Sequence, residues 1–271
     1  MKDLRFSMIG ADPEYAIGHR QDWVVSTISA QQVFGTSNFA GGIIGTDGHM
    51  ETGELRPTPA HNVHLLLHNI GEALEMLHRF TSRKGYSLYA SPYASTLPLG
   101  GHIHLSFRAR PAVRLVTALW NRITTHLDYY MEPLEAWFPC RPLRERRNHN
   151  YPGAEISRIP KTTNPFRLEY RRPSTWLGHP AIAYVYLATA KLVALNINQE
   201  LTPSASTLNL NYFESFHSRL QTLRTGVMSA DLSELPEMLD FLVENRMRLI
   251  NPTEPIDIEA WRAVILPRRN P

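Results

Sequence analysis

Residues 166–176 read FRLEYRRPSTW, and the first part of this stretch alternates between apolar and charged side chains. Arg167, Glu169 and Arg171 occupy every second position, with a leucine and a tyrosine between them. A period of two is typical of a β-strand with one buried face, so the three charges are expected to share the other face. Charged groups lose hydration when they are shielded from water, so such a face either binds a ligand or stays exposed as a ladder of ion pairs.

Two arginines beside one glutamate suit an anionic ligand that carries a metal ion. Guanidinium groups form paired hydrogen bonds with phosphate or carboxylate oxygens, and a glutamate oxygen is a hard ligand for Mg²⁺ or Mn²⁺. The stretch therefore points to a site for a metal-bound polyanion.

The composition is that of a globular protein: 271 residues, 43% hydrophobic and 20% charged. The net charge of +3 is compatible with a phosphate-bearing ligand but does not indicate nucleic acid. A single cysteine, Cys140, excludes an internal disulfide and favours a reducing compartment. We find no signal-peptide pattern, and the most apolar segment, 181–195, is shorter than a membrane span, so we expect a cytoplasmic protein without a membrane partner.

A pair of acids lies near the N-terminus, in the stretch RFSMIGADPEYAIG. Asp12 and Glu14 flank Pro13, so both carboxylates point the same way in an extended chain. Proline cannot donate to a sheet ladder, and we expect a strand start, an edge or a bulge here. Neighbouring carboxylates repel each other unless a cation or a proton lies between them, which favours a metal site; the alternative is an Asp-Pro turn that enters a strand.

A predicted hairpin repeats the combination of an acid with an arginine. Its strands, 42–45 and 53–56, flank a turn that contains Asp-Gly. Glu54 and Arg56 share one face of the second strand, and the leucine between them points the other way. Two further candidates for metal ligands lie in the connecting loop, namely Asp47 and Glu51.

The stretch GGHIHLSF predicts another strand with a polar face. His102, His104 and Ser106 alternate with apolar residues, so both imidazoles point to one side. A neutral imidazole can ligate a metal or bond a phosphate oxygen, and the preceding glycines permit a close approach of the backbone. The alternative is a pair of half-exposed histidines without a ligand.

Helices are predicted between and after these strands. Thr58 and Pro59 indicate a cap and a first helical position, and apolar residues then continue at helical spacing to Leu77. Further helices are predicted over residues 111–137, 180–198, 209–224 and 233–250.

A basic and irregular segment, 141–160, contains Asn148 and Arg158. Such a segment can fold over phosphates or remain solvated. The aromatic side chains that stack on bases are sparse in it, so we do not expect a nucleic-acid partner.

Strand segments with one polar and one apolar face predict an α+β fold, with a mainly antiparallel sheet whose polar catalytic face is open and whose other face is backed by helices. We expect residues 1–271 to form a single catalytic domain, with a helical C-terminal part from about residue 179. Acids, histidines and arginines on one face match the demands of phosphoryl transfer from ATP.

Four motifs in order resemble the carboxylate–amine ligase superfamily, which includes glutamine synthetase and glutamate–cysteine ligase: DPE, ELRP, GGHIH and RLEYRRPSTW. Within that superfamily the chain is most similar to the compact phage-type amidoligases, the carboxylate–amine ligases of type 2. The resemblance implies a curved sheet like that of the glutamine synthetase catalytic domain. It also implies ATP and two or three Mg²⁺ or Mn²⁺ ions as cofactors.

The resemblance assigns a role to each motif residue. It implies that the metal ligands are Asp12, Glu14, Glu54, His102 and Glu169, with the choice between Glu51 and Glu54 left open. It implies that the catalytic residues are Arg167, Arg171 and Glu54. It implies that the nucleotide phosphates are contacted by His104, Arg56, Asn148, Arg158 and Arg167.

The implied activity is an ATP-dependent ligation of a small-molecule or peptide carboxylate to an amine through an acyl phosphate, in the host cytoplasm if the protein is phage-encoded. Two alternatives remain open: a zinc-dependent hydrolase that uses His102 and His104 as ligands, and a noncatalytic nucleotide-binding protein. The sequence does not predict the identity of the substrates or the oligomeric state.

Overall fold

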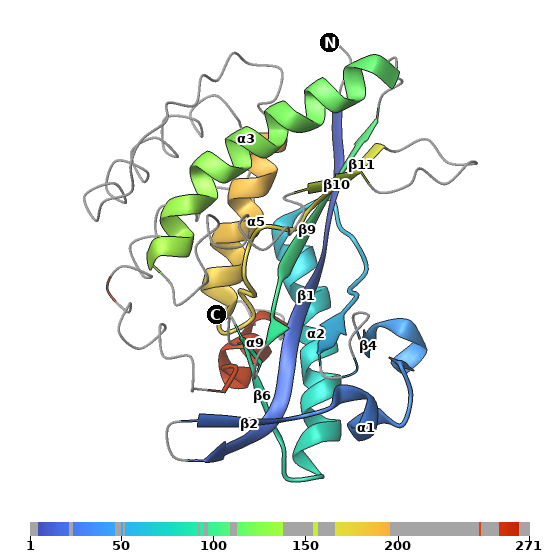
Figure 1. Cartoon of the computed structure of the whole chain (residues 1–271), viewed down its shortest axis with the longest axis vertical. Helices are drawn as coiled ribbons and strands as arrows, with labels where there is room; N and C mark the ends of the chain where they lie inside the picture. The colour runs from blue at the N-terminus through green and yellow to red at the C-terminus, as the bar shows by residue number, and fades with distance from the viewer. Residues whose placement is uncertain are drawn as a thin grey trace, which may run out of the picture.

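The structure is a computed structural model that describes residues 5–21, 24–46, 50, 52–90, 93–94, 97–108, 113–137, 154–156, 166–195, 244 and 255–265. These residues form a mixed α/β fold in which helices cover one face of an antiparallel sheet (Figure 1).

Nine strands of the described chain form one sheet around the long strand β1 (Arg5–Gln21). The main strand order is β10-β11-β9-β1-β5-β4-β3, and β2 and β6 also pair with β1. Every pairing is antiparallel. The remaining strands of the sheet are β2 (Val24–Ile28), β3 (Asn38–Phe39), β4 (Ile44–Thr46), β5 (Gly53–Leu55), β6 (Ser87–Tyr89), β9 (Gly101–Arg108), β10 (Ala154–Ile156) and β11 (Phe166–Tyr170). A separate two-stranded pair joins β7 (Tyr93–Ala94) and β8 (Leu97–Pro98).

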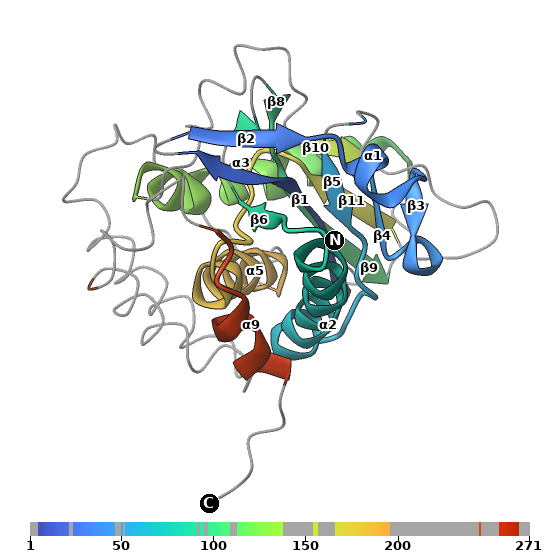
Figure 2. The same cartoon turned by 90° about the horizontal axis from the view of Figure 1, so that it is seen from below.

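The helices lie on the apolar side of the sheet. Seen from below, α2 (Val63–Ser82), α5 (Pro180–Leu195) and α9 (Ile258–Ile265) lie together beneath the strands (Figure 2). The long helix α3 (Val113–Trp137) packs against α5, and α9 packs against α2. The short helix α1 (Ala30–Phe34) and the 3-10 turn Ala40–Gly42 lie near the β3–β4 edge. The prediction of a mainly antiparallel sheet with a polar face and a helical backing is confirmed.

Helix α5 forms the centre of the core because nearly every side chain on it is apolar. Residues 180–194 are all buried, which an amphipathic surface helix does not allow. Helix α5 contacts both β1 and β9 on the apolar face of the sheet. The alternate residues of these strands, such as Ile9 and Leu105, belong to the same buried cluster as α5.

Helix α2 begins later than the predicted start at Thr58 and Pro59, and this prediction was wrong. Ala60 exchanges two backbone hydrogen bonds of 2.8 Å with Ile9, so the chain is still extended there. The helix is capped instead by Asn62, whose Oδ1 accepts a hydrogen bond of 2.7 Å from the Leu65 N–H.

Pro13 lies in the middle of β1, so the expectation of a strand start, an edge or a bulge at this proline was also wrong. The ladder between β1 and β9 ends with the pair Pro13 and Gly101, and the ladder between β1 and β5 begins at Glu14. The Glu14 N–H donates towards β9, to the Gly100 carbonyl over 2.8 Å, so the nitrogen of Pro13 faces the other side of β1, where β5 does not yet pair.

Other sequence predictions met mixed outcomes. The hairpin is confirmed as β4 and β5, and the helices predicted at 111–137 and 180–198 appear as α3 and α5. The segment 141–160 is not irregular throughout, because residues 154–156 add a strand to the sheet beside β11. Helix α9 was not predicted. The helices predicted at 209–224 and 233–250 lie outside the described residues apart from Glu244, which is helical.

Gly100 and Gly101, at the start of β9, contact the PSTW segment that follows β11. Gly100 and Ser174 form a bridge, and the Gly101 N–H donates to the Pro173 carbonyl over 2.9 Å. The indole of Trp176 lies across Gly101 and donates its Nε1–H to the Gly101 carbonyl over 3.0 Å. A β-carbon on Gly101 would lie 2.5 Å from the indole Nε1, so only glycine leaves room for the ring.

None of the helices in the described part of the chain is both long enough and apolar enough to cross a membrane.

We predict that Gly101→Ala destabilises the protein, because the added methyl group overlaps the buried indole and a neighbouring carbonyl. Overpacking of this kind costs about 1–3 kcal/mol. Urea unfolding of the two proteins measures the difference. The matched control is Gly178→Ala, whose β-carbon would meet only Ala90, at 4.0 Å. An equal loss in both variants would contradict the packing role of Gly101.

Candidate active site

The pairing register brings the predicted site residues onto one face of the sheet. Across β1 and β9, Asp12 lies opposite His102. Across β9 and β11, His104 lies opposite Glu169. Residues opposite each other in an antiparallel ladder share a face, so β1, β9 and β11 contribute to one surface. Strand β5 adds Glu54, which lies opposite the Glu14 of β1.

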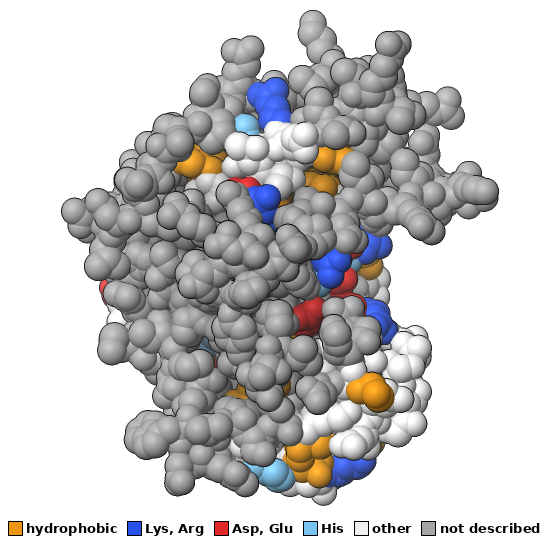
Figure 3. Space-filling view, in the orientation of Figure 1, with side chains coloured by type: hydrophobic (Ala, Val, Ile, Leu, Met, Phe, Trp, Pro, Cys, Tyr) orange, Lys and Arg blue, Asp and Glu red, His pale blue; other side chains and the backbone are white. Residues whose placement is uncertain are grey.

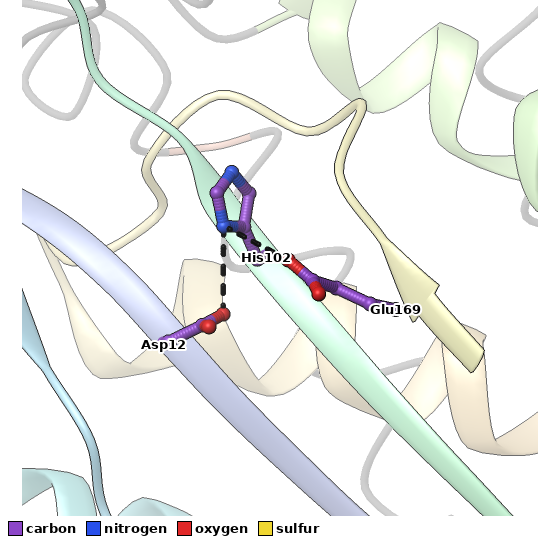
Figure 4. A group of neighbouring side chains, drawn as sticks. All are labelled: Asp12, His102 and Glu169. Carbon is purple, nitrogen blue, oxygen red and sulfur yellow. Dashed lines mark ion pairs between the residues drawn. The ribbon is translucent and has the colours of Figure 1, made fainter. Parts of the chain in front are cut away.

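The centre of this surface is a group of three possible metal ligands, Asp12, His102 and Glu169 (Figure 4). They come from three adjacent strands, and their ligand atoms lie within 4.8 Å of one another. The Nδ1 of His102 is 3.6 Å from an oxygen of each carboxylate. Within the described chain, Asp12 Oδ1 is buried and has no hydrogen-bond partner. Two carboxylates and an imidazole fit a divalent cation, and so does the buried Asp12 oxygen that lacks a hydrogen-bond partner in the described chain.

Glu14 on β1 and Glu54 on the neighbouring β5 extend the acidic surface away from β9, and both are buried. One oxygen of Glu14 accepts a short hydrogen bond of 2.5 Å from the Gly100 N–H. Its other oxygen, Oε1, lies 3.8 Å from His102 Nε2. The backbone therefore holds one oxygen of Glu14, and the other faces the histidine of the central group.

His104 joins an arginine to the central group. Its Nε2 is 3.2 Å from Asp12 Oδ2, and its Nδ1 is 2.7 Å from a terminal nitrogen of Arg167. The same guanidinium nitrogen is also 3.1 Å from Nε2 of His104, so Arg167 lies against the edge of the ring between its two nitrogens. This arrangement orients one oxygen of Asp12 and leaves Oδ1 to face His102.

The environment of Asp12 favours its charged form. Burial alone would raise the pKa of this carboxyl, but the hydrogen bond from His104 and the charges of His104, His102 and Arg167 outweigh burial. The pKa of Asp12 therefore lies below its ordinary value. A carboxylate that stays ionised is the form that binds a metal.

Basic side chains lie beside the acids. Arg171 Nε is 3.6 Å from Glu169 Oε1, and Arg167 is exposed beyond His104. Arg56 forms an ion pair with Glu54. In the space-filling view, basic and acidic side chains gather at the middle of the right-hand edge of the molecule (Figure 3). An anion that carries a metal ion would meet both kinds of group there.

The structure thus brings together the predicted residues Asp12, Glu14, Glu54, Arg56, His102, His104, Arg167, Glu169 and Arg171. Four other candidates, Asp47, Glu51, Asn148 and Arg158, lie outside the described residues.

Sequence reasoning did not identify two residues that fix Glu14 by hydrogen bonds. Gly100 donates to Glu14, and the Thr175 hydroxyl donates to the Glu14 carbonyl over 2.6 Å. Both belong to motifs that the sequence analysis quoted, GGHIH and PSTW, but neither carries a charge or an imidazole that would have marked it as a candidate.

One face of the antiparallel sheet thus gathers acids, imidazoles and arginines, the kinds of group that enzymes use to handle charged substrates. The comparison with protein families agrees with this interpretation. Residues 9–250 match the family described as phage phiEco32-like COOH.NH2 ligase-type 2, and the chain belongs to that family of carboxylate–amine ligases. No curated protein matches the sequence.

Solved structures share the fold at low sequence identity. The ligase PafA, solved in complex with the prokaryotic ubiquitin-like protein Pup, is 11% identical with a TM-score of 0.58; the match covers 90% of this chain and 64% of PafA. A bifunctional glutathione synthetase from Pasteurella multocida is 13% identical with a TM-score of 0.53; the match covers 96% of this chain and 50% of that protein. This chain therefore spans less than two thirds of the length of either protein.

We predict that Asp12→Asn removes a pH-dependent part of the stability of the metal-free protein. Because the pKa of Asp12 is lowered on folding, its contribution is fully present above the ordinary value of 3.8 and is lost as the pH falls through the folded pKa. Urea unfolding in EDTA measures the free-energy difference between wild type and variant. This difference should change as the pH falls below 3.8. A difference independent of pH down to acid unfolding would contradict the assignment.

Proposed function

We propose that this protein is an ATP-dependent carboxylate–amine ligase that forms an amide through an acyl phosphate at a cluster of Mg²⁺ or Mn²⁺ ions. The observation that carries the proposal is the single sheet face on which Asp12, His102 and Glu169 converge beside Arg167 and Arg171. Membership of the ligase family supports the reaction class. The proposal treats residues 1–271 as one catalytic domain.

The proposed reaction has two steps. First, an oxygen of the substrate carboxylate attacks the terminal phosphorus of ATP, the bond to ADP breaks, and an acyl phosphate forms. Next, the amine nitrogen attacks the acyl carbon, loses a proton and expels inorganic phosphate, which leaves an amide. Such a transfer depends mainly on positioning and on offsetting negative charge.

The acidic face would hold the cations. We assign Asp12, Glu14, Glu54, His102 and Glu169 as ligands of two or three ions, which is more donors than a single Mg²⁺ takes from protein. When bound, the cations neutralise phosphate oxygens and hold ATP in line with the carboxylate.

The basic residues would meet the anionic groups of the substrates. We assign Arg167 to the transferred phosphate and Arg171 to the substrate carboxylate or acyl phosphate, because both lie on β11 beside Glu169. His104 would lie near the nucleotide phosphates, with Asn148 and Arg158 as further contacts. Small molecules or peptides would supply the carboxylate and the amine, and no nucleic acid or membrane takes part. The protein would act in the cytoplasm.

The zinc hydrolase interpretation is less well supported by the geometry. It requires His104 to offer a lone pair to zinc, but the Arg167 guanidinium lies 2.7 and 3.1 Å from its two ring nitrogens, and Nε2 also faces Asp12. A guanidinium this close to a zinc ligand is unfavourable, because the guanidinium and the zinc ion are both cations.

We predict that Glu169→Ala abolishes the metal-dependent part of ATP binding. Isothermal titration with a nonhydrolysable ATP analogue, with and without Mg²⁺ or Mn²⁺, measures it. Loss of an outer-shell partner of a metal site costs about 10- to 100-fold in affinity, and loss of a direct ligand should cost at least as much. The matched control is Glu72→Ala, an exposed glutamate on α2.

Two outcomes would refute the proposed site. One is wild-type protein that binds no nucleotide with any metal, which would redirect attention to zinc content and hydrolysis. The other is a Glu169→Ala variant that still releases ADP at the wild-type rate when an amine is supplied. Nucleotide binding without turnover for any acid and amine pair would favour a noncatalytic role.

A further inference from the structure

Arg56 makes an unusually complete set of contacts for a residue beside an open site. Its Nε donates to Glu54 Oε1 over 3.0 Å, and one terminal nitrogen, Nη2, donates to Glu54 Oε2 over 3.3 Å. The same nitrogen donates to the Thr46 carbonyl over 3.0 Å, and Nη1 donates to Asn38 Oδ1 over 2.9 Å. A guanidinium has five N–H groups, so four of them are used within the protein.

The site of these contacts is shaped by a glycine. Gly45 lies opposite Glu54 in the register of β4 and β5, and the guanidinium of Arg56 lies where a side chain of residue 45 would project. A β-carbon on Gly45 would overlap Nη1 and would lie 3.0 Å from Cζ of Arg56. The β3–β4 edge thus provides a seat for the guanidinium, made of Gly45, Asn38 and the Thr46 carbonyl.

The carboxylate held by this seat is buried and lies opposite Glu14. A bidentate pair with a guanidinium fixes the plane of a carboxylate as well as its charge. Metal ligands depend on such outer-shell partners for their orientation. Within the described part of the chain, four of the five N–H groups of Arg56 already have acceptors, which leaves one for a nucleotide phosphate.

We propose that Arg56 is a positioning residue that orients Glu54 for the cation cluster, seated on Gly45, rather than a ligand of the nucleotide as its motif suggests. The proposal rests on the proposed function, because it takes Glu54 as a cation ligand. Arg56 acts through Glu54, and the seat belongs to strands that carry no other assigned site residue.

A double-mutant cycle on Gly45→Ala and Arg56→Ala tests the proposal, with Mn²⁺ affinity in the absence of nucleotide as the first readout. Gly45→Ala keeps every charge of the site but displaces the guanidinium. It should weaken Mn²⁺ binding about 10- to 100-fold in the wild-type background. In the Arg56→Ala background the same substitution should change the affinity by less than about twofold, because the group it displaces is gone. Gly178→Ala, which meets only Ala90, is the matched glycine control.

An equal loss in both backgrounds would overturn the proposal, since the added methyl group would then act on the strand itself, where it also approaches the Ser37 carbonyl at 2.9 Å. Unchanged Mn²⁺ affinity in Gly45→Ala and Arg56→Ala, with weaker binding of the ATP analogue in Arg56→Ala, would also overturn it. That result would restore Arg56 as a nucleotide contact.

A second readout separates this inference from the proposed function. In the metal-free wild type, the Nε–H signal of Arg56 in a ¹H–¹⁵N NMR spectrum should be protected from solvent exchange, and Gly45→Ala should abolish that protection. Protection without any Mn²⁺ or ATP binding would refute the proposed function and leave Arg56 as the partner of Glu54. A rapidly exchanging signal in the wild type would refute the inference whatever the protein binds.

Discussion

Repulsion between carboxylates is the constraint on which this structure depends. Four acids share one face of the sheet, and two of them, Glu14 and Glu54, are buried opposite each other. Two like charges 4 Å apart repel by about 4 kcal/mol at the effective dielectric constant near a protein surface. That is a large part of the 5–15 kcal/mol by which a domain is typically stable. The site therefore requires cationic or hydrogen-bonding partners for its acids and a frame that cannot relax to separate them.

The sheet supplies both. Its apolar face is fixed by contact with α5, so strands β1 and β9 cannot shift register without exposing core residues. On the polar face three of these acids have different compensating partners. Glu14 receives a backbone N–H, Asp12 faces two imidazoles, and Glu54 is paired with Arg56. A divalent cation would complete the compensation at the central group, where Asp12 Oδ1 has no hydrogen-bond partner in the described chain.

The alternation of polar and apolar residues was sufficient to predict the sheet, its polar face and the nine candidate residues that the structure brings together. Period two is a local property, so it can be seen in Arg167, Glu169 and Arg171 without knowledge of the fold. What the pattern could not predict depends on contacts between distant segments. The delayed start of α2 follows from the pairing of Ala60 with Ile9, and the tolerance of Pro13 follows from where β5 begins to pair with the edge of β1 opposite β9. The contacts of Arg56 depend on Gly45, which has no side chain to mark it in the sequence.

The coupling of the site to the C-terminal helix follows from the same non-local contacts. Trp176 donates to the Gly101 carbonyl, and the next carbonyl along from Trp176, that of Leu177, accepts from the indole of Trp261 in α9 over 2.9 Å. The Asp257 N–H also donates to Gly178. Residues 257–261 lie beyond the segment that matches the family, yet they form hydrogen bonds with the segment that follows β11. That segment contributes Thr175, which donates to the Glu14 carbonyl, and it pairs with Gly100, which donates to the Glu14 carboxylate. Helix α9 carries no chemical group of the site, but it stabilises the backbone that restrains one of its buried acids, so its role is visible only once the chain is folded.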